Sequence, residues 1–205
     1  MDIETRHGPA AAALDLPDGP PPYLVVLTHG SAGSVDAPDV LAVRDAVAAR
    51  GGGVARVTQP FRLAGRRAPG SAVKQDEAWL DIVAAVRAAV GGDAPVVQGG
   101  RSNGARVACR TAGAAGARAV VALAFPLHPP GRPERSRLEE LRAAAECVPV
   151  LVVNGDRDPF GVPEPVGGVD LRVRPGERHA LDRDAAAVGV IVGDWIAAVV
   201  QDHQK

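Results

Sequence analysis

The sequence is poor in aromatic side chains, which make up 3% of its 205 residues. Proteins that bind single-stranded nucleic acid stack the bases on such rings, so this scarcity argues against that class. The formal net charge of −1 gives no field that would attract nucleic acid or an anionic membrane. We therefore expect a small-molecule substrate and neither a nucleic-acid partner nor a membrane partner.

Long apolar runs are also missing. No run approaches the roughly 18 uninterrupted apolar residues of a membrane-spanning helix. The first residues, from Met1 to Arg6, lack the basic segment and apolar core that a signal peptide requires. The sequence thus predicts a soluble, cytoplasmic protein. Its length suits one α/β domain with a buried core, so we expect residues 1–205 to form a single domain.

Cysteine is nearly absent as well. The two cysteines, Cys109 and Cys147, lack the spacing of metal ligands, and in a cytosolic chain such residues are usually free thiols. Neither the dinucleotide fingerprint G-x-G-x-x-G nor the phosphate loop G-x-x-x-x-G-K-[ST] occurs, which argues against a nucleotide-binding fold. We expect no disulfide, no metal site and no organic cofactor, and no motif indicates an oligomeric state.

What the chain does contain is a regular alternation of short β-rich runs with helical patterns. The expected strands are 23–28, 54–57, 96–98, 119–124, 150–154 and 171–174, and the expected helices are 37–50, 74–90, 105–114, 137–146 and 182–200. Strands that are apolar on both faces predict a doubly wound, mostly parallel sheet flanked by helices on both faces. Turn signals in the first twenty residues predict an antiparallel hairpin at one edge of this α/β fold.

The most informative motif is the G-x-S-x-G formed by Gly100, Ser102 and Gly104. It lies directly after an apolar run and directly before a helix-like run, which is the context of a nucleophile elbow. In such a turn the serine adopts a sparsely populated backbone conformation, and the glycines avoid collisions with the neighbouring strand and helix. The alternative is a glycine-rich turn in which Ser102 only caps the next helix.

A serine hydroxyl becomes a useful nucleophile only when a base takes its proton and an acid orients that base. Asp158 follows the expected strand 150–154, and His179 follows the last expected strand. The resulting order Ser, Asp, His is that of the α/β-hydrolase triad. Asp156 is the alternative acid, although its position after Gly155 suits a structural turn better.

Other histidines offer alternatives to His179 as the base. His128 is expected to line the pocket as a specificity residue, and His29 to be structural, whereas His7 and His203 are expected to be exposed near the termini. Ligands of parallel sheets collect at the carboxyl ends of the strands. The residues expected there to bind substrate are Phe61, His128 and Phe160.

The charge that develops on a substrate carbonyl oxygen needs backbone N–H donors. We expect these from Asn103, which follows the serine, and from Ser31 in the loop after the first expected strand, with Ala32 as the alternative to Ser31. In the loop 61–68, three arginines would either bind an anionic substrate or make structural contacts. They are Arg62, Arg66 and Arg67.

Several motifs together resemble a small, lidless branch of the α/β-hydrolase superfamily. They are Thr28-His29-Gly30 with Gly33, Pro60-Phe61 followed by residues 65–69, Gly99-Gly100-Arg101-Ser102 with Gly104, residues 126–131, and residues 157–161. The branch is related to dienelactone-hydrolase-like proteins and to the hydrolase-like domain of a chromatin-associated, non-specific-lethal complex subunit. The resemblance implies Ser102, Asp158 and His179 as triad positions, and Asn103 stands where Met or Gln is usual.

These observations predict a serine hydrolase, carboxylesterase-like, that cleaves a small ester or thioester through an acyl-enzyme on Ser102. The alternative is a catalytically idle α/β-hydrolase domain that serves as a scaffold for protein interaction, as a fold alone does not establish activity. A pseudoenzyme usually loses a triad residue, and here all three are present in order.

Overall fold

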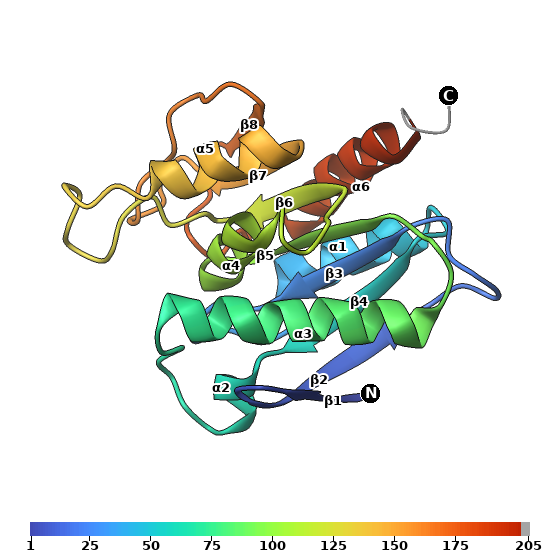
Figure 1. Ribbon diagram of the computed structural model, residues 1–205. Helices are drawn as coiled ribbons and strands as arrows, with labels where there is room; N and C mark the ends of the chain where they lie inside the picture. The colour runs from blue at the N-terminus through green and yellow to red at the C-terminus, as the bar shows by residue number, and fades with distance from the viewer. Residues whose placement is uncertain (202–205) are drawn as a thin grey trace.

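The computed structural model describes residues 1–201 and contains one eight-stranded sheet (Figure 1). Its strands lie in the order β1-β2-β4-β3-β5-β6-β7-β8. The strands are β1 (Asp2–Thr5), β2 (Gly8–Asp15), β3 (Leu24–Thr28), β4 (Gly53–Thr58), β5 (Val96–Arg101), β6 (Ala119–Leu123), β7 (Val150–Gly155) and β8 (Val169–Arg174). All pairs from β4 to β8 are parallel, and β2 is antiparallel to both β1 and β4. The expected edge hairpin is therefore confirmed.

Helices cover both faces of this sheet, as predicted. They are α1 (Pro38–Ala48), α2 (Pro60–Leu63), α3 (Ala72–Val90), α4 (Asn103–Thr111), α5 (Leu138–Cys147) and α6 (Ala185–Gln201). Figure 1 shows α3 and α4 in front of the sheet and α1 and α6 behind it. Side chains of a strand alternate between the two faces, so Val25 and Leu27 pack in the cluster with α1 and α6, whereas Leu24 and Val26 pack in the cluster with α3.

The differences from the sequence prediction are local. Strand β5 continues to Arg101, directly before Ser102, and the expected loop 61–68 begins with the short helix α2. His7 is half-buried beside Glu77 rather than exposed, and His203 lies outside the described residues. None of the helices within residues 1–201 has the length and apolar character needed to cross a membrane.

A buried ion pair joins the start of α1 to the end of β5. Asp39 Oδ2 lies 3.0 Å from Arg101 Nε, and the Asp39 side chain is fully buried. Asp39 Oδ1 accepts a hydrogen bond from the backbone N–H of Val40 at 3.0 Å. Burial raises the pKa of Asp39 to about 6, against the opposing attraction of Arg101. A carboxyl whose pKa is raised by folding binds its proton more tightly in the folded state than in the unfolded state.

The variant Asp39→Asn is expected to remove a pH-dependent part of the stability. The contribution of the Asp39 proton is fully present below about pH 4 and is lost as the pH rises through about 6. The free energy of unfolding of the wild type, relative to Asp39→Asn, should therefore fall by about 3 kcal/mol between about pH 4 and about pH 7. Urea unfolding of both proteins across this range measures the difference.

The control for this prediction is Asp45→Asn, which removes a carboxylate from the exposed side of the same helix. A difference between the wild type and Asp39→Asn that stays flat with pH would contradict the raised pKa of Asp39. An equal change in Asp45→Asn would also contradict it.

Candidate active site

Ser102 occupies a tight turn between β5 and α4. Its backbone has φ 54° and ψ −111°, a region that non-glycine residues rarely adopt. A Cβ added to Gly100 would lie 2.7 Å from the carbonyl carbon of Gly104, and one added to Gly104 would lie 2.7 Å from Thr28 Cγ2. Both glycines of the motif are therefore required, because the strand, the helix and β3 approach one another too closely for side chains.

The Ser102 side chain does not cap α4. Its Oγ lies 2.9 Å from His179 Nε2, and His179 Nδ1 lies 2.8 Å from Asp158 Oδ2. A carboxylate only accepts hydrogen bonds, so Nδ1 carries the proton and Nε2 is left to accept from the serine hydroxyl. The structure thus brings together the three residues named from the sequence, from the loops after β5, β7 and β8.

Asp158 is buried and well held, whereas Asp156 is exposed and lies elsewhere. Asp158 Oδ1 accepts the backbone N–H of Phe160 at 2.8 Å, which leaves Oδ2 for His179. Asp156 Oδ1 accepts the backbone N–H of Gly176 at 2.7 Å and so links the loop after β7 to the loop after β8. Of the two acids, only Asp158 contacts the histidine within residues 1–201.

His29 is a buried structural residue. Its Nδ1 donates to the carbonyl of Gly30 at 2.8 Å, and its Nε2 accepts the backbone N–H of Gln59 at 3.1 Å. Burial lowers the pKa of His29, and both ring nitrogens are occupied in the neutral form. The ring is therefore not available as a base for Ser102.

A cavity of about 520 Å³ opens beside Ser102. It is lined by Gly30, Ser31, Ala32, Gly33, Pro69, Arg101, Ser102, Asn103, Arg106, Pro126, Pro130, Arg137, Phe160 and His179. Another cavity, of about 490 Å³, lies at the amino ends of β5, β6 and β7. It is not lined by Ser102, Asp158 or His179. Because ligands of parallel sheets bind at the carboxyl ends of the strands, the cavity beside Ser102 is the candidate substrate site.

Of the three residues expected to bind substrate, the structure places only Phe160 in this cavity. Phe61 is the second residue of α2 and packs edge-on against His29, with ring centroids 5.6 Å apart. It lines a separate cavity of about 200 Å³ together with Arg66. His128 lies outside both cavities, and its Nδ1 contacts the carbonyl of Pro129 at 2.9 Å. Neither Phe61 nor His128 therefore lines the cavity beside Ser102, and a role of either in substrate binding stays a prediction.

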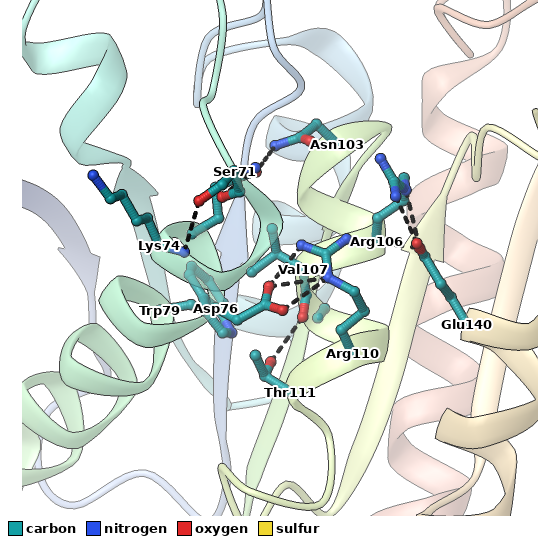
Figure 2. Close-up of polar contacts among 12 residues, drawn as sticks. Ser71, Lys74, Asp76, Trp79, Asn103, Arg106, Val107, Arg110, Thr111 and Glu140 are labelled. Carbon is teal, nitrogen blue, oxygen red and sulfur yellow. Dashed lines mark hydrogen bonds and ion pairs between the residues drawn. The ribbon is translucent and has the colours of Figure 1, made fainter. Parts of the chain in front are cut away.

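The two expected backbone donors border the same cavity. A Cβ added to Gly30 would lie 3.1 Å from Ser102 Cβ, so the loop that carries Ser31 passes directly beside the serine. Asn103 is the first residue of α4, where backbone N–H groups have no acceptor within the helix. Figure 2 shows its side chain turned toward α3, where Nδ2 donates to Gln75 Oε1 at 2.8 Å.

Three arginines line the cavity, and the sequence analysis assigned a role to none of them. Arg101 pairs with Asp39 and donates from Nη2 to the carbonyl of His179 at 2.8 Å. Arg106 pairs with Glu140, and Arg137 donates from Nη1 to a backbone carbonyl. The available signals were the place of Arg101 inside the motif and of Arg137 at the start of the helix after β6.

Comparison with known proteins agrees with this architecture. No curated protein sequence matches the chain. A serine hydrolase without a lid from Xanthomonas campestris has a TM-score of 0.75 and 19% identity, over 98% of this chain and 93% of that one. The esterase domain of a Rhodothermus marinus protein has a TM-score of 0.74 and 18% identity, over 98% of each chain.

A third structure, Est1E from Butyrivibrio proteoclasticus with ferulic acid bound, has a TM-score of 0.74 and 18% identity, over 98% of this chain and 99% of that one. At such identities these likenesses show the fold alone. The family model described as "Alpha/beta hydrolase domain" matches residues 21–180, most of the sheet and all the loops discussed above. The chain therefore belongs to the alpha/beta hydrolase domain family.

Proposed function

We propose that the protein is a serine hydrolase of the esterase type that cleaves small esters or thioesters through an acyl-enzyme on Ser102. The observation that carries this proposal is the chain of contacts from Ser102 Oγ through His179 to the buried Asp158, with distances of 2.9 and 2.8 Å. This is the arrangement that activates a serine hydroxyl. The esterase and serine hydrolase folds among the similar structures support it.

In the first half of the reaction, Ser102 Oγ attacks the carbonyl carbon of the ester while His179 Nε2 takes the hydroxyl proton. The carbonyl oxygen becomes negative, and the backbone N–H groups of Asn103 and Ser31 are the donors that stabilise it. When the tetrahedral intermediate collapses, His179 gives the proton to the departing alcohol or thiol. The acyl group then remains bonded to Ser102.

In the second half, water replaces the alcohol in the cavity. His179 Nε2 takes a proton from this water, whose oxygen attacks the acyl carbon, and the carbonyl oxygen again accepts from the same two N–H groups. Collapse breaks the bond to Ser102 Oγ, and His179 returns the proton to that oxygen. The products are a carboxylic acid and the free enzyme, with Asp158 ionised throughout to stabilise the charged histidine.

The proposal of a small substrate follows from how little chain is available to cover the site. Strand β6 ends at Leu123 and β7 begins at Val150, and the connection between them holds only the helix α5. That connection is too short for a cap of several helices. Among the residues that line the cavity, Phe160 is the one large apolar side chain.

A scaffold without activity is the competing function. It predicts no requirement for the contacts between Ser102, His179 and Asp158, because protein interaction does not use an activated hydroxyl. Chemical reactivity of Ser102 therefore distinguishes the two functions.

A fluorophosphonate probe is expected to label Ser102, and Ser102→Ala should abolish labelling. Because triad residues act as a unit, Ser102→Ala and His179→Ala should each lower ester turnover by on the order of 10⁶-fold. Mass spectrometry of the labelled protein identifies the residue, and hydrolysis of 4-nitrophenyl acetate measures turnover. Labelling of a different serine, or none on folded protein, would favour the scaffold, and normal turnover in His179→Ala would rule out this residue as the base.

Replacement of the two acids should separate their roles. Asp158→Asn is expected to lower kcat by about 10⁴-fold, because an amide in this position favours the wrong histidine tautomer. Asp156→Asn is the matched control and should cost far less, since Asp156 contacts a backbone N–H and not His179. The reverse ranking, measured on equally folded proteins, would transfer the role of the acid to Asp156.

The value of kcat/KM should depend on the length of the acyl chain of the ester. An open cavity with one aromatic side chain forgoes roughly 0.8 kcal/mol for each methylene that it fails to bury. We therefore expect kcat/KM for 4-nitrophenyl esters to be highest from acetate to butyrate and lower at octanoate. A steady rise through decanoate would indicate a deep apolar tunnel and contradict the open site.

A further inference from the structure

We propose that the cavity selects esters whose acyl part carries a carboxylate, and that Arg137 binds this carboxylate. The inference rests on the proposed function, because it concerns the substrate of the same site. It is carried by the distribution of charge around the cavity. Three arginines and no acidic side chain line it.

Two of these arginines are already matched by buried or half-buried carboxylates. Arg101 pairs with Asp39 at 3.0 Å and also holds the carbonyl of His179. Arg106 makes two hydrogen bonds to Glu140, with Nε 2.9 Å from Oε2 (Figure 2). Because each of these two guanidinium groups is paired with a carboxylate, little of their positive charge is left for a ligand.

Arg137 differs from both. Within residues 1–201 it forms no ion pair, and its side chain donates from Nη1 to the carbonyl of Pro126 at 3.2 Å. A guanidinium has five N–H donors, so most of its hydrogen-bonding capacity is not used by that contact. Its backbone N–H donates to the carbonyl of Leu127 at 2.7 Å, which fixes this residue at the start of α5.

The carboxylates nearby are already engaged by other arginines. Glu140 pairs with Arg106 and lies 3.7 Å from Arg110, and Arg110 also pairs with Asp76. Three arginines, counting Arg137, thus lie near these two carboxylates, and Arg137 is the one that pairs with neither. Burial, and next the like charge of Arg106, lower the pKa of Arg137, the effect expected where a cation lacks a full partner.

One guanidinium without an ion pair fits one carboxylate. The planar guanidinium matches a carboxylate in a two-pronged geometry, and such charge-assisted hydrogen bonds are among the strong ones. A phosphate dianion would need a second unmatched cation at the cavity, and Arg101 and Arg106 are both paired. A monoester of a short dicarboxylic acid therefore has the chemistry that this site recognises.

The test compares two esters of the same size. One is the 4-nitrophenyl monoester of adipic acid, and the other is its neutral counterpart in which the distal carboxylate is an amide. The wild type should hydrolyse the anionic ester with a kcat/KM at least about tenfold higher than that of the amide, a factor that corresponds to about 1.4 kcal/mol. Spontaneous hydrolysis of each ester is measured without enzyme and subtracted.

Three variants assign the preference to one residue. Arg137→Gln should abolish it through a higher KM for the anionic ester, and should still hydrolyse the amide, which shows that it is folded. Arg137→Lys should retain part of the preference, because it keeps the charge and loses the planar geometry. Arg135→Gln, the matched control, removes an exposed arginine two residues away and should behave like the wild type.

The inference is overturned if the wild type shows no preference, if Arg137→Gln keeps it, or if Arg135→Gln loses it equally. Failure of the proposed function would look different, because neither ester would be hydrolysed and Ser102 would not be labelled. In that case a binding measurement tests the inference. The adipic acid monoamide anion should bind to Ser102→Ala protein, as detected by ligand-observed NMR. It should bind at least about fivefold more weakly to the double variant that also carries Arg137→Gln. Equal binding to both proteins would overturn the inference as well.

Discussion

The close approach of three backbone segments at Ser102 is the constraint on which the rest of the site depends. Gly100 and Gly104 bring β5 and α4 together against β3, and the serine between them is held at a positive φ. Such a conformation costs about 1–3 kcal/mol and persists only where the surroundings enforce it. Here the backbone N–H of Ser102 donates to the carbonyl of Leu123 at 2.9 Å, which ties the turn to β6.

A buried polar network behind the turn also holds Ser102 in this conformation. Gln98 of β5 donates to the carbonyl of Ala108 at 2.7 Å and to Thr111 at 3.1 Å, and it accepts the indole N–H of Trp79 at 2.9 Å. One amide thereby joins β5, α4 and α3. Because each buried polar atom of this network has a partner, displacement of α4 would leave several of them unpaired. The strained turn is therefore fixed from both sides.

The loop that carries His179 is also held in place by several contacts. Asp158 contacts the ring, and Arg101 contacts the carbonyl of the same residue at 2.8 Å. Two residues earlier, the buried carboxylate of Glu177 accepts the backbone N–H of Asp184 at 2.8 Å. The histidine thus has its ring and its backbone positioned by separate elements. Since a small misplacement of a catalytic group lowers rates greatly, this double anchoring suits the role proposed for it.

The sequence was sufficient to predict the parts of the site that follow from linear patterns. Strand runs, the glycines around Ser102 and the order of Ser102, Asp158 and His179 are all visible along the chain, and parallel topology brings the loops together. Asp39 and Arg137 could not be predicted, because their roles depend on which charges are paired across long sequence separations. Phe61 lies away from the cavity beside Ser102, because the chain after β4 turns into α2.

An open site places particular demands on electrostatics. Without a cap, water reaches the reacting groups, so apolar enclosure contributes little to holding a substrate, and fixed charges have to orient it. Arg101 and Arg106 are each paired with a carboxylate, so Arg137 is the arginine of the cavity wall that is left for the proposed substrate carboxylate. Asp158 holds the ring of His179: its side chain is fully buried, and within residues 1–201 its only ion pair is with His179. In the proposed reaction, Arg137 therefore orients the substrate and Asp158 orients the base.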